Sequence, residues 1–125
     1  MLYIKTTIWT SQIHGIWLFA DQDITKWELL WEFIFWLDIS LTEEQYVNLQ
    51  ESGKYFIDSY GWRDQITQKY MLNIDNSRFI NHSKNPNIVH YEYKLFAARN
   101  IAKWEELTDN YSDFDDNFAI TKIEA

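Results

Sequence analysis

The side chains best suited to binding a ligand are concentrated in residues 78–87, which read RFINHSKNPN. Asn and Ser side chains hydrogen-bond to nearby backbone and favour turns. Pro86 fixes its own φ and pushes Asn85 towards extended geometry. The flanking triplets RFI and NIV carry branched and aromatic side chains that are typical of strands. We therefore predict a strand that enters a polar loop and a second strand that leaves it. The alternative is an Asn-rich turn that only satisfies its own hydrogen bonds.

His82 has the one side chain in this loop that commonly binds metals or moves protons. No nearby carboxylate or second histidine has the spacing of a metal site or of a catalytic triad. The chain has no cysteine, which removes disulfides and thiolate metal sites. The sequence therefore predicts no metal, and a role for His82 other than general base.

The composition predicts one folded domain with an acidic surface. A chain of 125 residues with 46% hydrophobic and 18% aromatic residues can bury a core and is not disordered. It has no run of 18 apolar residues, so we predict no membrane span. The first residues, MLYIKTTIWTSQ, lack the order of a secretory signal. We expect a cytoplasmic location, with the nucleus as an open alternative.

The net charge of −8 bears on partners. Nucleic-acid binding needs a basic footprint, so we predict no nucleic-acid partner. An acidic surface would steer a basic, lysine-rich protein segment towards the chain, although solubility alone would also explain the charge.

The pattern of apolar residues predicts a mostly β fold with a short helical insert at about 41–61. Thr42 can cap a helix, with Gln45 completing a capping box. We expect this helix to break near Gly53, resume over residues 54–60 and end at Gly61. Core positions of the insert are predicted at Leu41, Tyr46, Leu49 and Phe56, and aromatics that line a groove at Tyr55, Phe56, Tyr60 and Trp62. Strands are predicted at residues 2–9, 14–20, 28–35, 70–75 and 106–111, with a hairpin over 87–101.

One segment of the chain occurs twice. FADQDITKWELL at residues 19–30 aligns with FAARNIAKWEEL at 96–107, with Phe, Ala, Ile, Lys, Trp, Glu and Leu at the same offsets. We interpret each copy as a strand end, a tight turn at the Lys-Trp pair and a new strand. The alternative is a chance similarity of two hairpins.

Three blocks, HGIWLFA at 14–20, RFINHSKNPN at 78–87 and AARNIAKWEELTDNY at 97–111, together resemble the SET domain in order and spacing. The resemblance covers about residues 3–118. It implies the SET fold of protein-lysine methyltransferases, with a pseudoknot at the NHSxxPN segment and S-adenosylmethionine (SAM) as cofactor. We predict a single SET domain over 1–125, with a short acidic tail at 112–125 and without a zinc-binding tail.

The resemblance also implies residue roles. Tyr111 matches the family's catalytic tyrosine, whose hydroxyl would orient the substrate amine. The implied cofactor-binding residues are Gly15, Ile16, Trp17, Arg78, Phe79, Asn81, His82 and Tyr111. The implied substrate channel holds Tyr70, Asp109 and Phe114, with Phe118 as a further residue that closes it. Arg78 and Phe79 could instead be core-flanking residues.

The residue types suit the chemistry of methyl transfer to an amine. Such an in-line displacement needs positioning and a lysine that has lost its proton. Deprotonating a free lysine at pH 7 costs roughly 4 to 5 kcal/mol. A dry aromatic channel lowers this cost because it disfavours the ammonium form.

The chain departs from the family pattern at several positions. Asp109 replaces an aromatic that governs the number of methyl groups in many relatives, so that rule does not carry over. Asn110 replaces an Asp. Tryptophan stands where relatives have glycine at Trp17, Trp27, Trp104 and two further positions, Trp36 and Trp9.

These tryptophans suggest a hypothesis about the gene. The chain has 3 Gly and 7 Trp, against roughly nine Gly for an average chain of this length. Under this hypothesis the source of the gene reads the codon UGA as glycine, whereas this sequence was written with UGA as tryptophan. Ordinary UGG codons at these positions would refute the idea. If the residues are tryptophan, each turn with φ > 0 would cost about 1 kcal/mol or more.

Three functions follow from these observations. The first is a SAM-dependent protein-lysine methyltransferase acting on a basic lysine-containing protein. The second is a SET-like binding module without turnover, in which Trp17 or Asn110 spoils the cofactor site. The third is a methyltransferase with another kind of acceptor. A homodimer through exposed aromatics is a further expectation.

Overall fold

The computed structural model describes residues 1–11 and 15–115. His14, which opens the second predicted strand, and Phe118, with the tail beyond residue 115, lie outside the described residues.

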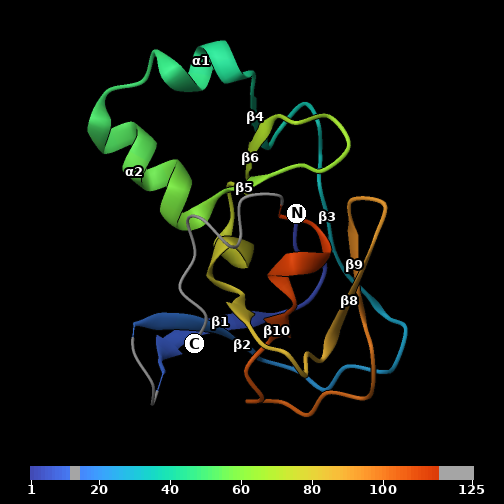
Figure 1. The fold of residues 1–125 in the computed structure, drawn as a ribbon. Coiled ribbons are helices and arrows are strands. Elements are labelled where there is room, and N and C mark those ends of the chain that lie inside the picture. The colour runs from blue at the N-terminus through green and yellow to red at the C-terminus, as the bar shows by residue number, and fades with distance from the viewer. Residues whose placement is uncertain (12–14, 116–125) are drawn as a thin grey trace.

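Short strands in small sheets form most of the regular structure, which confirms the predicted mostly β fold (Figure 1). An antiparallel hairpin consists of β1 (Thr6–Thr10) and β2 (Ile16–Ala20). Two antiparallel sheets have three strands each, in the order β3 (Leu29–Glu32), β9 (Lys94–Ala97), β8 (Ile88–Tyr91) and in the order β4 (Ile39–Leu41), β6 (Tyr70–Leu72), β5 (Trp62–Arg63). A parallel pair consists of β7 (Asn81–His82) and β10 (Thr108–Asp109).

The helical insert lies at one end of the molecule (Figure 1) and consists of α1 (Glu43–Val47) and α2 (Glu51–Tyr60). The capping box predicted at Thr42 and Gln45 is present. The predicted break near Gly53 is wrong, because the helix breaks at residues 48–50 and Gly53 lies inside α2. Glu51 in the first turn of α2 suits the positive end of the helix dipole there. The predicted end at Gly61 is confirmed.

Two apolar clusters hold these elements together. The main cluster joins both halves of the chain through fully buried side chains such as Leu18, Trp31 and Ile101. The second cluster holds Ile57, Tyr70 and Leu72, with the predicted Leu41, Tyr46 and Leu49 packed against it. Phe56 is 41% exposed, so its predicted core position is wrong.

Two predicted strand segments are instead turns of 3-10 helix. The RFI strand is wrong, because Asn76–Phe79 forms η1, capped by the Asp75 side chain that accepts a hydrogen bond from the Ser77 N–H at 3.0 Å. The last strand is shorter than predicted and leads into η2 (Tyr111–Asp113). The Asn110 side chain caps η2 by accepting a hydrogen bond from the Ser112 N–H at 3.1 Å.

The repeated segments are related by an approximate two-fold axis. Ile24 and Ile101, which occupy the same position in the two copies, exchange a pair of backbone hydrogen bonds of 2.8 and 2.9 Å. Both side chains are buried in the main cluster. The two turns therefore stabilise each other.

The same symmetry extends to two tryptophans. The Trp27 N–H donates to the Ala97 carbonyl and the Trp104 N–H donates to the Ala20 carbonyl, each at 2.8 Å. Both tryptophans have left-handed backbone conformations, with φ of 71° and 77°. Glycine adopts this conformation at little cost, whereas a residue with a side chain is strained in it. Their rings lie at the surface, 63% and 62% exposed.

The other tryptophans at family-glycine positions differ. Trp9 and Trp17 face each other across the β1–β2 hairpin, and neither they nor Trp36 have positive φ. Only Trp27 and Trp104 therefore stand where the backbone requires glycine-like freedom, and the codon hypothesis stays a prediction.

We predict that Trp27→Gly and Trp104→Gly each raise the free energy of unfolding by about 1 kcal/mol, because glycine removes the left-handed strain. Urea unfolding followed by circular dichroism measures this change. The matched control is Trp9→Gly, which removes an equally exposed indole from an extended strand and should lower stability. Destabilisation by all three substitutions would show that the ring contacts outweigh the strain.

Candidate active site

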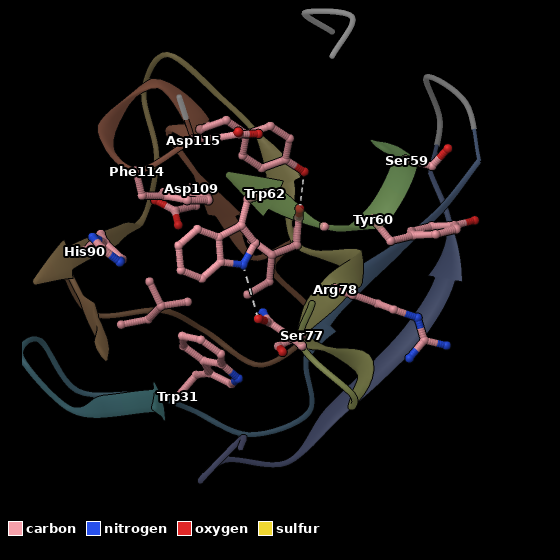
Figure 2. Close-up of a pocket in the computed structure, with 15 residues that line it drawn as sticks. Trp31, Ser59, Tyr60, Trp62, Ser77, Arg78, His90, Asp109, Phe114 and Asp115 are labelled. Atoms are coloured by element: carbon pink, nitrogen blue, oxygen red, sulfur yellow. Dashed lines mark hydrogen bonds between the residues drawn. The ribbon is translucent and has the colours of Figure 1, made fainter. Parts of the chain in front are cut away.

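A cavity of about 540 Å³ lies between the helical insert and the C-terminal strands. Its lining comes from β3, the end of α2, β5, η1, β8, β10 and η2, so distant parts of the chain meet there (Figure 2). The tryptophan and phenylalanine rings of Trp31, Trp62 and Phe114 supply much of the lining.

Tyr111 is held in this cavity by both its backbone and its side chain. Its N–H donates to Nδ1 of His82 at 3.1 Å, and its hydroxyl donates to the carbonyl oxygen of Ile80. Its ring packs on the rings of His82 and Phe114, with centroid distances of 5.2 and 5.9 Å. The phenol oxygen therefore has a defined position on the cavity wall.

The parallel pairing of β7 with β10 sets the position of Tyr111. Asn81 lies opposite Thr108 and His82 opposite Asp109, and the Ser83 N–H donates to the Asp109 carbonyl at 2.9 Å. Because Tyr111 follows β10 by two residues, this register places it beside His82.

The side chain of Asn81 contacts protein groups on both of its polar atoms. Its Oδ1 accepts the His82 N–H at 2.8 Å, and its Nδ2 donates to Oε2 of Glu106 at 3.2 Å. Asn81 and His82 are almost completely buried. In this structure their side chains order the loop and Tyr111.

Asn87 closes the same loop. Its Oδ1 accepts the Thr108 N–H at 2.9 Å and its Nδ2 donates to the Glu106 carbonyl at 2.8 Å. Its own N–H donates to Oγ1 of Thr108 at 3.2 Å. The predicted pseudoknot segment is thus bonded along residues 106–109 at both of its ends.

Burial is the main cause that raises the pKa of Tyr111, and the negative charges of Asp109, Asp115 and Glu106 raise it further. The phenol therefore stays protonated throughout the physiological range. It can donate and accept hydrogen bonds, but it is not a base.

Burial also raises the pKa of Asp109 to about 8, with a smaller contribution from Asp113 in the same direction. The hydrogen bond from the Asn110 N–H to Asp109 Oδ1, at 2.8 Å, opposes this shift. The Asp109 carboxyl group therefore changes its charge near neutral pH, which is unusual for Asp.

Arg78 is the one Lys or Arg residue that lines the cavity in the described part of the chain. Its Nη1 donates to the carbonyl oxygens of Ile74 and Asp75 at 3.4 and 3.2 Å. Its Nε is buried and has no hydrogen-bond partner among the described residues. In Figure 2 its side chain points away from Trp62, towards the outer side of the site. A buried N–H donor on a guanidinium suits a carboxylate.

The structure brings part of the predicted site together. Of the predicted residues, Arg78, Asp109, Tyr111 and Phe114 line the cavity. Phe79 and His82 do not line it but contact Tyr60 and Tyr111, which do. The Asn81 side chain bonds to His82 and Glu106, which lie outside the lining.

Gly15, Ile16 and Trp17 lie outside the cavity, at the start of β2. Gly15 has φ +72°, and its carbonyl accepts a hydrogen bond from the Ser11 N–H at 2.9 Å to close the β1–β2 hairpin. β2 packs against η1, the element that carries Arg78. The predicted cofactor residues therefore lie on adjacent elements but not around one cavity.

Tyr70, which was predicted in the same channel as Tyr111, does not line this cavity but lines a smaller adjoining one that shares Gly61, Trp62 and Asp115 with it. The Tyr70 ring stacks on Tyr46 with a centroid distance of 3.9 Å, and its hydroxyl accepts a hydrogen bond from Arg63 at 2.9 Å. It is buried in the second cluster because β6 turns that face towards the insert.

Sequence reasoning found Tyr60 and Trp62 as groove aromatics but missed Trp31, His90 and Asp115. His90 lies in β8, and burial lowers its pKa. Strand alternation does not say which face of β8 meets the cavity, so no sequence signal selects His90. Tyr55 is 75% exposed and does not line the cavity.

Among residues 1–11 and 15–115, no group of three or more His, Cys, Asp or Glu side chains is arranged to hold a metal ion. Within the same residues, no helix has the length and apolar character needed to cross a membrane.

Comparisons with known proteins identify relatives. The family model described as SET domain matches residues 15–112. A Mycosarcoma maydis protein named histone-lysine N-methyltransferase, H3 lysine-36 specific, is 30% identical over 130 residues and 88% of this chain. A Plasmodium falciparum variant-silencing SET domain-containing protein is 31% identical over 111 residues and 78% of this chain.

The chain is much shorter than these relatives, since it spans 12% of the first and 4% of the second. A chain of the Chaetomium thermophilum Polycomb Repressive Complex 2 bound to GSK126 has a similar fold, with a TM-score of 0.71 at 24% identity. That match covers 93% of this chain and 17% of the other.

We predict that Asn87→Ala lowers the free energy of unfolding by at least about 2 kcal/mol, because it leaves the Thr108 N–H and the Glu106 carbonyl without their partners. Asn85→Ala, an exposed site two residues away, should change it by less than about 0.5 kcal/mol. Urea unfolding of the two variants tests this, and equal losses would contradict the assigned role of Asn87.

Proposed function

The chain belongs to the SET-domain family, and from this premise we propose that it transfers a methyl group from SAM to a lysine ε-amine of a protein. SET domains are a family of protein-lysine methyltransferases, which supports the class of enzyme. The observation that carries the proposal is the placement of Tyr111, whose hydroxyl is bonded to the Ile80 carbonyl at the wall of a cavity lined by aromatic rings.

Tyr111 would position the acceptor amine. Because the hydroxyl proton is donated to Ile80, the phenol oxygen would act as an acceptor for an N–H of the substrate amine. This hydrogen bond would orient the nitrogen lone pair towards the methyl group, and orientation of this kind can supply several kcal/mol of a displacement barrier. Carbonyl oxygens beside the site would support the methyl through weak C–H···O contacts.

The lining would hold the amine in its reactive form. Trp31, Trp62 and Phe114 are apolar surfaces that exclude water from the amine. Removal of water disfavours the ammonium form and therefore lowers the pKa of the lysine.

The chemistry of the site fits SAM as donor. When bound, SAM supplies an electrophilic methyl group on a sulfonium centre. The buried Nε–H of Arg78 suits the carboxylate of its amino-acid part. The adjacent start of β2, with Gly15, Ile16 and Trp17, is the proposed continuation of the cofactor site.

The proposed substrate is a basic, lysine-containing protein segment. The net charge of −8 would steer such a segment to the chain. The name of the Mycosarcoma maydis relative refers to histones, which are lysine-rich proteins of this kind. A homodimer, a cytoplasmic or nuclear location and a single domain over 1–125 stay predictions.

A second function, a SET-like module that binds proteins without turnover, is supported by one observation. Trp17 carries a large side chain where relatives have glycine, 3.8 Å from the place where a Cβ of Gly15 would lie. The indole is therefore close to the segment proposed for the cofactor.

We predict that the chain binds SAM in calorimetry and methylates lysine in a mixture of lysine-rich peptides. Tyr111→Phe should retain SAM binding within a few-fold and lose about 100-fold or more in kcat, because it removes one positioned polar contact from the transition state. Mass spectrometry of the peptides measures the product.

The control is Tyr91→Phe, which removes a hydroxyl from an exposed tyrosine and should leave kcat unchanged. SAM binding by Trp17→Gly but not by the unchanged chain would favour the binding module. An undiminished kcat in Tyr111→Phe would refute the assigned role of the tyrosine.

A further inference from the structure

Methylation of lysine requires that the ammonium group of the substrate first loses one proton. A substrate lysine arrives as an ammonium ion, whereas only the neutral amine has the lone pair that attacks a methyl group. Tyr111 cannot take this proton, because burial and the surrounding carboxylates keep its phenol protonated. Another group in the cavity must take it, or the proton must escape to water before the lysine enters.

Asp109 is the buried acidic group best placed for this task. Its side chain lines the cavity with Tyr111, the residue is only 2% exposed, and its charge acts on the Tyr111 phenol. In Figure 2 it projects from beside Phe114 towards the interior of the cavity. A carboxyl group with so little contact with water needs a partner inside the protein.

Within residues 1–11 and 15–115, the side chain of Asp109 has one such partner. Oδ1 accepts the Asn110 N–H at 2.8 Å, and Oδ2 accepts no hydrogen bond from any described residue. No Lys or Arg forms an ion pair with it in the described chain. One carboxylate oxygen is therefore unused in a cavity proposed to receive a cation.

The other charged groups around the cavity do not supply a positive charge to Asp109. Asp113, two residues beyond Tyr111, opposes its ionisation. Asp115 and Glu106 add negative charge around Tyr111. Arg78 donates to the backbone of residues 74 and 75, and its side chain points to the outer side of the site.

His90 and Asp115 are the competing proton acceptors. Burial lowers the pKa of His90, and its Nε2 has no partner among the described residues, so it remains neutral and is a weak base. Asp115 already accepts the Arg63 N–H on Oδ1 at 3.0 Å. Asp115 is nearly as buried as Asp109, so the experiment below must separate the two carboxylates.

We propose that Asp109 holds the substrate ammonium through Oδ2 and receives its proton before methyl transfer. The inference rests on the proposed lysine methylation, since it names the group that prepares the acceptor. The raised pKa of Asp109, about 8, agrees with it, because a base near the operating pH shares a proton with a desolvated lysine more readily than an ordinary carboxylate does.

The proton balance of the step is complete. The ammonium N–H bond breaks and an O–H bond forms on Asp109, which leaves a neutral amine and a neutral carboxylic acid. The nitrogen lone pair then forms the new N–C bond while the sulfonium C–S bond breaks, and its electron pair stays on sulfur. The product is a methylammonium ion, and Asp109 returns its proton to water when the product leaves.

We predict that Asp109→Asn lowers kcat/KM for a lysine peptide at pH 8 by about 100-fold or more. Asn has the same shape and still accepts the Asn110 N–H, so the fold should persist, as circular dichroism can verify. The control Glu44→Gln removes the same charge from an exposed residue that does not line the cavity and should change kcat/KM less than about three-fold.

The pH profile of the unmodified chain is a second measurement that needs no variant. Only the ionised carboxylate of Asp109 can accept the lysine proton. Therefore kcat/KM should fall as pH falls below the pKa of Asp109, about 8, because the carboxylate becomes protonated. It should level off above that pH. In Asp109→Asn this break should be absent. A profile of the unmodified chain with no break between pH 7 and 9 would overturn the proposal.

A binding measurement without SAM separates this inference from the proposed function. Calorimetry should show that the unmodified chain binds a lysine peptide at least ten-fold more tightly than the same peptide with norleucine, an uncharged analogue. Asp109→Asn should lose this preference. If the preference depends on Asp109 but no methylation is found, the proposed function fails and the cation site remains.

Other outcomes would overturn the inference alone. If methylation is found and Asp109→Asn retains both the activity and the lysine preference, Asp109 is not the acceptor. If Asp115→Asn produces the losses expected of Asp109→Asn while Asp109→Asn does not, the proton goes to Asp115.

Discussion

The pairing of residues 81–87 with residues 106–111 is the interaction on which the site depends. Parallel hydrogen bonds between β7 and β10 set the register, and Asn87 bonds to Glu106 and Thr108 at the end of the loop. This register brings His82 to the N–H of Tyr111. Because the groups are buried, each lost hydrogen bond would leave an unsatisfied polar atom. The asparagine-rich loop therefore acts mainly as a support for the residues that line the cavity.

Burial gives two neighbouring acidic groups different roles. The pKa of Tyr111 is raised further above its ordinary value, so the phenol remains a neutral hydrogen-bonding group. The pKa of Asp109 is raised to about 8, so its carboxyl group changes its charge near neutral pH. The two shifts have the same leading cause, the loss of water, and the negative charge of Asp109 also raises the pKa of Tyr111. A cavity of this kind favours a cationic partner that can give up a proton, which is the character of a lysine side chain.

The repeated turns supply the framework on the other side of the core. Ile24 and Ile101 pair across the approximate two-fold axis, and the backbone of Trp27 and Trp104 bonds to the opposite copy. These bonds hold the turns in place even though both tryptophans adopt a left-handed conformation. Tertiary hydrogen bonding and the burial of Ile24 and Ile101 therefore outweigh a local conformational cost of about 1 kcal/mol per turn.

Local sequence patterns determined the family, the small β sheets, the capping box at Thr42 and the repeat, because each depends on residues close together in the chain. The same patterns placed Arg78 in a strand and the helix break at Gly53, since capping by Asp75 and packing of α2 are not visible in local propensity. Only the tertiary structure decided that Tyr70 belongs to the insert core and that His90 and Asp115 line the cavity. It also decided which oxygen of Asp109 is unused, because burial and partnership are set by segments distant in sequence that fold against each other.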